Sequence, residues 1–371
     1  MAFKEDIRIP LSAPNRKFIN DNGLKSQVSE FINLGPYLKG KYLDQFQMEF
    51  AKFIQVKYCV GVSSGTAALE LAFRSLDLPS ESKIGITANA GGYSSVAALR
   101  ANLVPKYLEV DQSGLLDLNG VNSETLNDLK AIVATNLYGQ STDILLLKEL
   151  IGTRNIYIIE DCAQSAGSVI NGHRSGFYSD ISTFSFYPTK NLSSFGDSGA
   201  ICTNIEEIAD RVKILREYGW TDRYFAEYPG GANYRMDDIH ALTLSKQLQN
   251  LDANNSRRRE IWNLYKNAIS ENDRMIGIND ESFIAHLAVI ASDNRAEFRK
   301  YFDAKGIDTG VHYPFPDYMQ PAFKNFFEKK LKVTETLCST VFSVPIFPEM
   351  SDVEVETVIN AISSWYLDKS N

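Results

Sequence analysis

The stretch Phe184-Ser185-Phe186-Tyr187-Pro188-Thr189-Lys190 leads from a short β-branched and aromatic segment into a single lysine. Residues 191–200 follow as a loop rich in glycine and serine. A lysine that lies just past a buried strand, at the edge of such a loop, is well placed to bond covalently to an aldehyde. A lone lysine in a loop is usually a surface residue, so other parts of the chain must decide between these interpretations.

Two motifs upstream of the lysine favour a functional site. Ser63-Ser64-Gly65-Thr66 lies where a predicted strand turns into a predicted helix, so that Gly65 would let a phosphate approach the first helical N–H groups. Asp161 ends a continuous apolar strand. A carboxylate there is costly to bury without a cationic partner, and a protonated pyridine nitrogen is such a partner. The alternative for Asp161 is to cap the segment that follows.

These features together predict a site for pyridoxal 5′-phosphate (PLP), with pyridoxamine phosphate as its amino form. Lys190 would bind the aldehyde and also act as the base and acid that moves a proton. Gln164 would turn its amide toward the 3-hydroxyl oxygen of PLP, or act only as a cap. Ser185 would add a contact to the phosphate, together with Gly65 and Thr66, or be one more strand serine. Tyr93 would stack on the pyridine ring, or be a core tyrosine.

The pattern along the chain predicts an α/β fold. Residues 131–135 and 156–160 are continuous apolar strands, which are typical of a parallel sheet covered on both faces. Strands that alternate with helices predict a layered architecture with a mostly parallel central sheet.

The pattern changes after Met236, where one long helix is predicted over residues 237–269 and a strand over 283–291. We expect residues 1–245 to form an N-terminal arm and a large PLP-binding domain, and residues 246–371 a smaller C-terminal α+β domain. The basic run from Arg257 to Arg259 is interpreted as a solvated helix face.

Composition and charge narrow the function further. The 371 residues are 44% hydrophobic and 23% charged, and the net charge of −8 argues against general nucleic-acid binding. The four cysteines and four histidines show no metal-ligand spacing, so we expect no metal and reduced thiols in the cytoplasm. The charged first residues do not match a signal peptide, and no apolar run approaches the roughly 20 residues of a membrane span.

The motifs resemble those of the DegT-type nucleotide-sugar aminotransferases, a branch of the fold-type-I PLP enzymes. The resemblance extends from about Leu34 to the C-terminal helix. It implies the three-layer PLP-dependent transferase fold and supports the roles given above for the cofactor contacts. The matching stretches are residues 60–69, 160–167, 184–190 and 231–236.

The resemblance also implies partners. Asn233 would reach the phosphate of the neighbouring subunit's cofactor, so the active unit would be a homodimer with shared active sites. Residues 87–95 depart from the common family pattern and resemble the subgroup that acts on dTDP-linked 3-keto-6-deoxyhexoses, and residues 312–314 indicate the same subgroup. L-glutamate would be the amino donor.

Substrate contacts are predicted only in outline. His312 and Tyr313 would contact the sugar, while Arg235, Lys39 and Lys41 are candidates to neutralise the pyrophosphate. For each of these three cations, a plain surface charge is the favoured interpretation. Two alternatives remain: amino transfer to C4 of the sugar, and a non-catalytic regulatory protein on the same scaffold. The second alternative predicts the loss of Lys190 or Asp161, and both are present.

Overall fold

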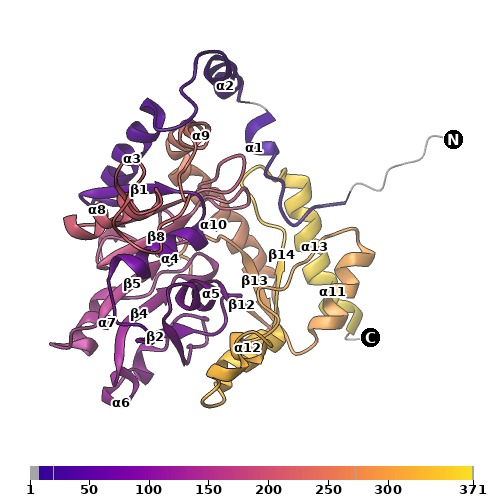
Figure 1. The fold of residues 1–371 in the computed structure, drawn as a ribbon. Helices are drawn as coiled ribbons and strands as arrows, with labels where there is room; N and C mark the ends of the chain where they lie inside the picture. The colour runs from indigo at the N-terminus through magenta and orange to yellow at the C-terminus, as the bar shows by residue number, and fades with distance from the viewer. Residues whose placement is uncertain (1–7, 20, 272, 370–371) are drawn as a thin grey trace.

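A seven-stranded sheet forms the centre of the larger part of the molecule (Figure 1). The computed structural model describes residues 8–19, 21–271 and 273–369, so residues 1–7 of the predicted arm lie outside the described residues. The strand order is β1-β9-β8-β5-β4-β2-β3, and only β9 runs antiparallel to its neighbours. The predicted α/β fold with a mostly parallel sheet is therefore confirmed. The strands are β1 (Tyr58–Val62), β2 (Lys83–Thr87), β3 (Val104–Leu108), β4 (Leu129–Thr135), β5 (Tyr157–Asp161), β8 (Ile181–Ser185) and β9 (Gly199–Thr203).

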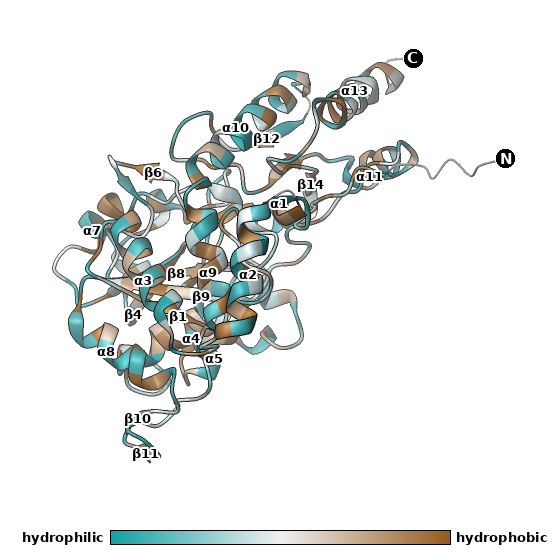
Figure 2. Ribbon diagram, turned by 90° about the horizontal axis from the view of Figure 1, so that it is seen from above, coloured by the Kyte–Doolittle hydropathy of each residue, from teal (hydrophilic) through white to brown (hydrophobic). Residues whose placement is uncertain are grey.

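Helices cover both faces of this sheet, which explains why its strands are apolar at successive positions. Ala131 and Val133 pack toward α4, α5 and α8, whereas Ile132 and Ala134 pack toward α7 on the opposite face. Figure 2 shows hydrophobic residues on the sheet-facing sides of the helices and hydrophilic residues outside. The helices are α3 (Lys41–Ile54), α4 (Gly65–Ser75), α5 (Tyr93–Arg100), α6 (Ser123–Leu126), α7 (Ile144–Ile151), α8 (Glu206–Leu215) and α9 (Asp238–Leu248).

A second, antiparallel sheet of three strands lies beside the large one (Figure 1). Its core includes Trp262, Phe298 and Phe342, which are fully buried. The elements are α10 (Leu251–Ala268), β12 (Arg274–Ile276), β13 (Ala288–Ala291), α11 (Arg295–Ala304), α12 (Lys332–Thr340), β14 (Val341–Val344) and α13 (Asp352–Lys369).

Shorter elements complete the described chain. Helices α1 (Arg16–Ile19) and α2 (Asn22–Leu34) precede the large sheet. The hairpin of β10 (Trp220–Asp222) and β11 (Phe225–Ala226) projects from the body (Figure 2). The remaining pieces are β6 (Val169–Ile170), β7 (His173–Arg174) and the 3-10 turns η1 (Leu118–Gly120), η2 (Leu137–Gly139), η3 (Asp317–Met319) and η4 (Lys324–Phe326).

Two predicted elements of the C-terminal part are wrong. The single helix over 237–269 is two helices, because Asn250 leaves the helical region at φ −108° and ψ 1°. The strand predicted over 283–291 begins only at Ala288, since the preceding segment bonds to the turn η2 instead of a strand. The N–H of Ile284 donates to the carbonyl of Gly139 at 2.8 Å, and Ala285 has a φ of 47°.

The basic run in α10 is also not simply a solvated face. Arg258 is buried, and its Nη1 donates to the carbonyl of Ile346 at 2.9 Å and to that of His286 at 3.3 Å. These bonds compensate for the burial of the guanidinium. The boundary predicted near residue 245 falls inside α9, and the division into domains stays a prediction.

The parallel strands β2, β4, β5 and β8 bring their carboxyl ends to one edge of the large sheet, where ligands commonly bind in open α/β sheets. Asp161 is the last residue of β5, and Tyr93 and Lys190 lie in the segments that follow β2 and β8. Across the described ranges, no helix combines the length and apolar character needed to cross a membrane.

Candidate active site

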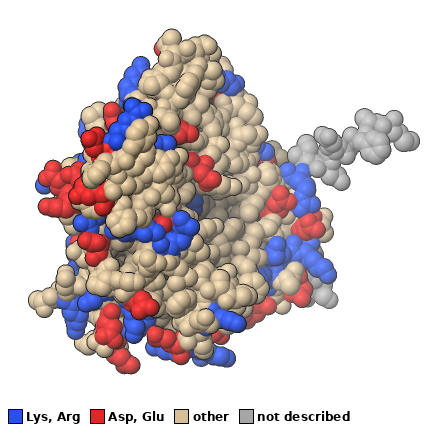
Figure 3. Space-filling model, in the orientation of Figure 1, with Lys and Arg blue, Asp and Glu red and all other residues tan. Residues whose placement is uncertain are grey.

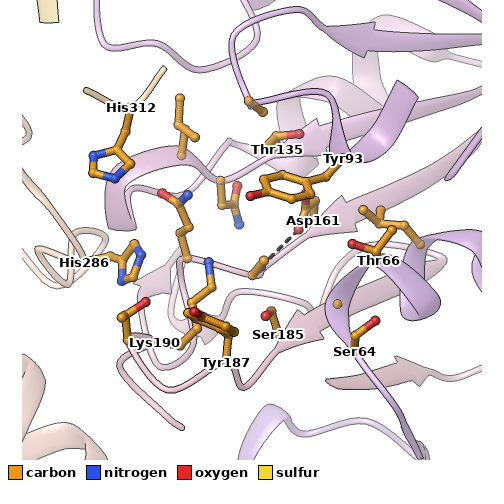
Figure 4. A pocket seen from close by; sticks show the side chains of 18 of the residues that line it. Ser64, Thr66, Tyr93, Thr135, Asp161, Ser185, Tyr187, Lys190, His286 and His312 are labelled. Atoms are coloured by element: carbon orange, nitrogen blue, oxygen red, sulfur yellow. Dashed lines mark hydrogen bonds between the residues drawn. The ribbon is translucent and has the colours of Figure 1, made fainter. Parts of the chain in front are cut away.

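A cavity of about 400 Å³ opens at this edge of the sheet, and Lys190 lies in its wall (Figure 4). The lysine follows β8 in a tight turn, in which its N–H donates to the carbonyl of Tyr187 at 2.8 Å. Burial lowers the pKa of Lys190 to about 8, and the charge of Asp161 acts in the opposite direction. A substantial share of neutral amine near pH 8 suits attack on a carbonyl carbon.

Asp161 lies on another wall of the same cavity, at the end of β5. Its Oδ1 accepts the N–H of Ala163 at 3.1 Å, the interaction dashed in Figure 4. Burial raises the pKa of Asp161, while this hydrogen bond and the charge of Lys190 lower it. A buried carboxylate with one backbone donor can accept a further bond from a protonated ring nitrogen.

Gln164 follows Asp161 and also lines the cavity. Its Oε1 accepts the N–H of Tyr138 at 2.7 Å, which fixes the orientation of the amide. The Nε2 group lies 3.4 Å from the hydroxyl of Tyr313. The amide therefore presents donors to the cavity, as an oxygen atom such as the 3-hydroxyl of PLP requires.

A cradle for a phosphate forms where β1 enters α4. Ser64 caps the helix, with its Oγ accepting the N–H of Ala67 at 3.1 Å, and Gly65 and Thr66 form the first turn. The first N–H groups of a helix have no partner within it and can bind an anion. A Cβ atom on Gly65 would lie 2.6 Å from the Cβ of Ser185, so the close approach of these two segments requires glycine. These residues fit the cofactor.

Tyr93 begins α5 and lines the cavity, with half of its surface exposed. The preceding Gly92 has a φ of 81°, a left-handed conformation that suits glycine. The ring of Tyr93 meets that of Tyr313 edge to face, with centroids 6.3 Å apart. Tyr93 is therefore not a core tyrosine.

His312 and Tyr313 come from the C-terminal part and also line the cavity. The Nδ1 of His312 lies 2.9 Å from the hydroxyl of Ser343, and the hydroxyl of Tyr138 donates to the carbonyl of His312 at 2.7 Å. Burial, together with the nearby Lys190, lowers the pKa of His312 to about 4, so this ring is neutral at pH 7.

The other predicted residues lie elsewhere. Asn233 is exposed and pairs through its backbone with Glu217, and Arg235 packs over the ring of Tyr218. Lys39 forms an ion pair with Glu217, and Lys41 lies over the ring of Tyr42. None of these four residues lines the cavity of the described chain, and Asn233 was predicted to serve the cofactor of the neighbouring subunit.

Sequence reasoning missed several lining residues, of which His286 and Tyr187 are the most prominent (Figure 4). Tyr187 lies within the lysine motif and could have been found by its position there. His286 was part of a predicted strand, and no local sequence pattern marked it as a cavity residue. Its position depends on the contact between residues 284–287 and the turn η2.

Comparisons with known proteins show the family of this chain. The chain is 34% identical to a dTDP-3-amino-3,6-dideoxy-alpha-D-galactopyranose transaminase of Aneurinibacillus thermoaerophilus, over 92% of this chain and 95% of that protein. It is 33% identical to a dTDP-3-amino-3,4,6-trideoxy-alpha-D-glucose transaminase of Streptomyces venezuelae, over 91% and 90% of the two proteins. The solved structure of S. venezuelae DesV superposes with a TM-score of 0.92 at 30% identity, covering 96% of this chain and 98% of that one. Residues 19–363 match one family, and the chain therefore belongs to the DegT/DnrJ/EryC1/StrS aminotransferase family.

Proposed function

We propose that this member of the family is a PLP-dependent enzyme that transfers the amino group of L-glutamate to C3 of a dTDP-linked 3-keto-6-deoxyhexose. One observation carries the proposal: Lys190, Asp161 and the cradle at Gly65 face one cavity at the carboxyl ends of the parallel strands. The two relatives whose names specify 3-amino sugars support C3 over the C4 alternative.

In this proposal the chain binds both the phosphate and the pyridine ring of the cofactor. Gly65, Thr66 and Ser185 bind the phosphate through the first turn of α4 and the hydroxyl of the serine. Asp161 binds the ring nitrogen, and the Nε2 of Gln164 donates to the 3-hydroxyl oxygen. Tyr93 covers one face of the ring. When bound, PLP supplies the electron sink for amino transfer.

Lys190 moves the proton. Because its pKa is about 8, the amine can accept a proton from the reacting carbon and return it later in the same site. The carboxylate of Asp161 is buried and stays close to the lysine, which limits the cost of a positive charge there.

His312 and Tyr313 stand where a sugar could contact them, on the wall contributed by the C-terminal part. The nucleotide pyrophosphate requires cations in spite of the net charge of −8. Figure 3 shows Lys and Arg side chains grouped beside the hollow at the centre of this face. Arg235, Lys39 and Lys41 remain proposals for this task.

A cytoplasmic homodimer with shared sites is part of the proposal. Asn233 is exposed and does not line the cavity of its own chain. This location suits a residue that contacts the cofactor of a partner subunit. Large apolar side chains are exposed on α2, α3 and the projecting hairpin. Examples are Leu34 at 74%, Met48 at 68%, Tyr224 at 72% and Phe225 at 63% exposure. Such surfaces commonly mark interfaces.

The visible absorbance spectrum of the purified protein tests the function. We expect a PLP band that bleaches on addition of L-glutamate and returns with a dTDP-3-keto-6-deoxyhexose, but not with the 4-keto isomer. Return with the 4-keto isomer alone would assign transfer to C4. The absence of any band after incubation with PLP would contradict the proposal and favour the regulatory alternative.

A further inference from the structure

His286 is a buried histidine in the cavity wall that the proposed mechanism does not use. It lies between β12 and β13, in the segment that bonds to η2, and Figure 4 shows its ring on the same side of the pocket as Lys190. Its Nδ1 lies 2.9 Å from the Oδ1 of Asn191, the residue that directly follows the lysine. One of these two atoms donates the hydrogen of this bond.

The hydrogen bonds of two neighbouring side-chain amides, those of Asn255 and Asn191, determine which atom is the donor. The Nδ2 of Asn255 donates to the carbonyl of Ala166 at 3.1 Å, so its Oδ1 is the atom that faces Asn191. The Nδ2 of Asn191 donates to that Oδ1 at 2.7 Å and to the carbonyl of Ile284 at 3.1 Å. Carbonyl oxygens only accept, so both amides have one possible orientation. The Oδ1 of Asn191 must then accept, and the Nδ1 of His286 carries the hydrogen.

The charge of the ring follows from its surroundings. Burial holds the pKa of His286 well below its ordinary value, and nearby positive charges lower it further. The charged neighbours are Lys190, Arg258 and Lys17, which come from three segments of the chain, and the neighbouring ring of His312 is neutral at pH 7. The imidazole is neutral at pH 7, and its Nε2 therefore has a free lone pair. Within the described residues, only Nδ1 of this ring has a protein hydrogen-bond partner.

In this structure Lys190 and His286 both line the cavity, and no hydrogen bond joins the side chains of these two described residues (Figure 4). We propose that His286 is a positioning residue for Lys190: when the lysine is not covalently bound and its amine takes up a proton, the side chain turns to donate a hydrogen bond to Nε2. This inference rests on the proposed function and deepens it. A lysine that must take up a proton in a buried site benefits from a neutral acceptor, because such an acceptor stabilises the ammonium without changing the net charge. Asn191 links the two residues, since it neighbours the lysine in sequence and fixes the tautomer of the histidine.

Two substitutions separate this role from packing. In His286→Asn, an amide N–H replaces Nδ1 and retains the bond to Asn191, but no atom remains at the position of Nε2. In His286→Gln, the longer side chain places an amide oxygen near the position of Nε2 and loses the bond to Asn191. A purely structural role would be served better by asparagine, whereas the proposed role would be served better by glutamine.

The first measurement is made on the cofactor-free protein and is independent of activity. Histidine labelled with ¹⁵N gives the tautomer of each ring in long-range proton–nitrogen NMR spectra, and this chain has four histidines. The signal missing from His286→Asn identifies His286. We expect a neutral ring with hydrogen on Nδ1 at pH 7. Hydrogen on Nε2, or on both nitrogens, would overturn the inference.

The second measurement is the rate of PLP capture by the cofactor-free protein as a function of pH, because capture requires the neutral amine of Lys190. Loss of a hydrogen bond to a charged group is expected to move the midpoint of this profile down by about one pH unit or more in His286→Asn. His286→Gln should keep the midpoint of the wild type.

An unchanged midpoint in His286→Asn, or equal shifts in both variants, would contradict the role proposed for His286. A wild-type protein that does not capture PLP would instead contradict the proposed function. The NMR result would still decide the tautomer in that case.

Discussion

At the scale of single residues, the cavity combines groups whose charges depend on burial. Lys190 is easier to deprotonate than an ordinary lysine, and Asp161 is harder to ionise than an ordinary aspartate. Both shifts arise mainly from the loss of water around the charged form. Clusters of such shifted groups are frequent at functional sites, since chemistry near neutral pH needs groups that can change protonation state there.

Replacement of Lys190 by alanine should remove both the covalent attachment of PLP and the proton carrier. We expect transaminase activity to fall by more than about 10³-fold, because proton transfer alone commonly contributes 10²–10⁴-fold. The coupled formation of 2-oxoglutarate measures the loss. Lys190→Arg serves as the matched control, since it keeps a positive charge but cannot bind the aldehyde. Activity close to wild type in Lys190→Ala would contradict the mechanism.

At the scale of elements, the close packing of α4 on β8 decides the shape of the phosphate cradle. In Gly65→Ala the new Cβ would lie 2.6 Å from the Cβ of Ser185, so one element must shift. We expect a loss of about 1–3 kcal/mol in the free energy of unfolding and weaker binding of PLP. Chemical denaturation and equilibrium dialysis measure the two effects.

The double variant Gly65→Ala/Ser185→Gly provides the control for this clash. Removal of the serine Cβ should restore much of the stability, while PLP binding stays weak because the serine hydroxyl is also lost. Equal stability of the single and double variants would show that the contact between these elements is unimportant.

The turn before α5 is fixed by a buried carboxyl group. Asp317 in η3 accepts the hydroxyl of Ser95 at 2.6 Å, and its N–H donates to the carbonyl of Ala88 at 2.8 Å. Burial raises the pKa of Asp317 to about 7, against 3.8 for an ordinary aspartate. Between these two pH values the folded state binds one more proton than the unfolded state, so the contribution of this group to stability decreases as the pH rises and levels off above 7.

Asp317→Asn removes this titration. We expect the melting temperature of the variant, measured relative to wild type, to rise as the pH increases from 4 to 7 and to change little above that. Thermal unfolding followed by circular dichroism at several pH values provides the comparison. A constant difference across the series would show that folding does not raise the pKa of Asp317.

Prediction from sequence succeeded where local patterns decide the structure. The strands around Asp161 and Lys190 are apolar on both faces, and that pattern requires a covered parallel sheet. Prediction failed where contacts between residues far apart in the sequence determine the structure. His286 reaches the cavity because Ile284 bonds to Gly139, and Arg258 is buried because carbonyls from two distant segments surround it. No local pattern in α10 or in residues 283–287 signals these contacts.

At the scale of the whole molecule, the proposed homodimer predicts complementation between two defective chains. Lys190→Ala should be inactive, and Asn233→Ala should bind PLP weakly. In a mixed dimer, one site would combine Lys190 of one chain with Asn233 of the other and be intact. We expect activity to appear when the two proteins are unfolded and refolded together.

The same two variants refolded separately and then combined provide the control, and they should show no gain. No gain after joint refolding, with mixed dimers confirmed by mass spectrometry, would contradict the sharing of sites.

The cavity has two structural origins. The groups proposed for PLP end the strands of the large sheet or follow them, whereas His286, His312 and Tyr313 come from segments attached to the second sheet. These two sets can therefore diverge at different rates: one part of the gene would preserve the shared chemistry, and the other would adapt it to different sugars. Exchange of the segment after residue 280 between relatives would be an economical route to enzymes with altered sugar preference.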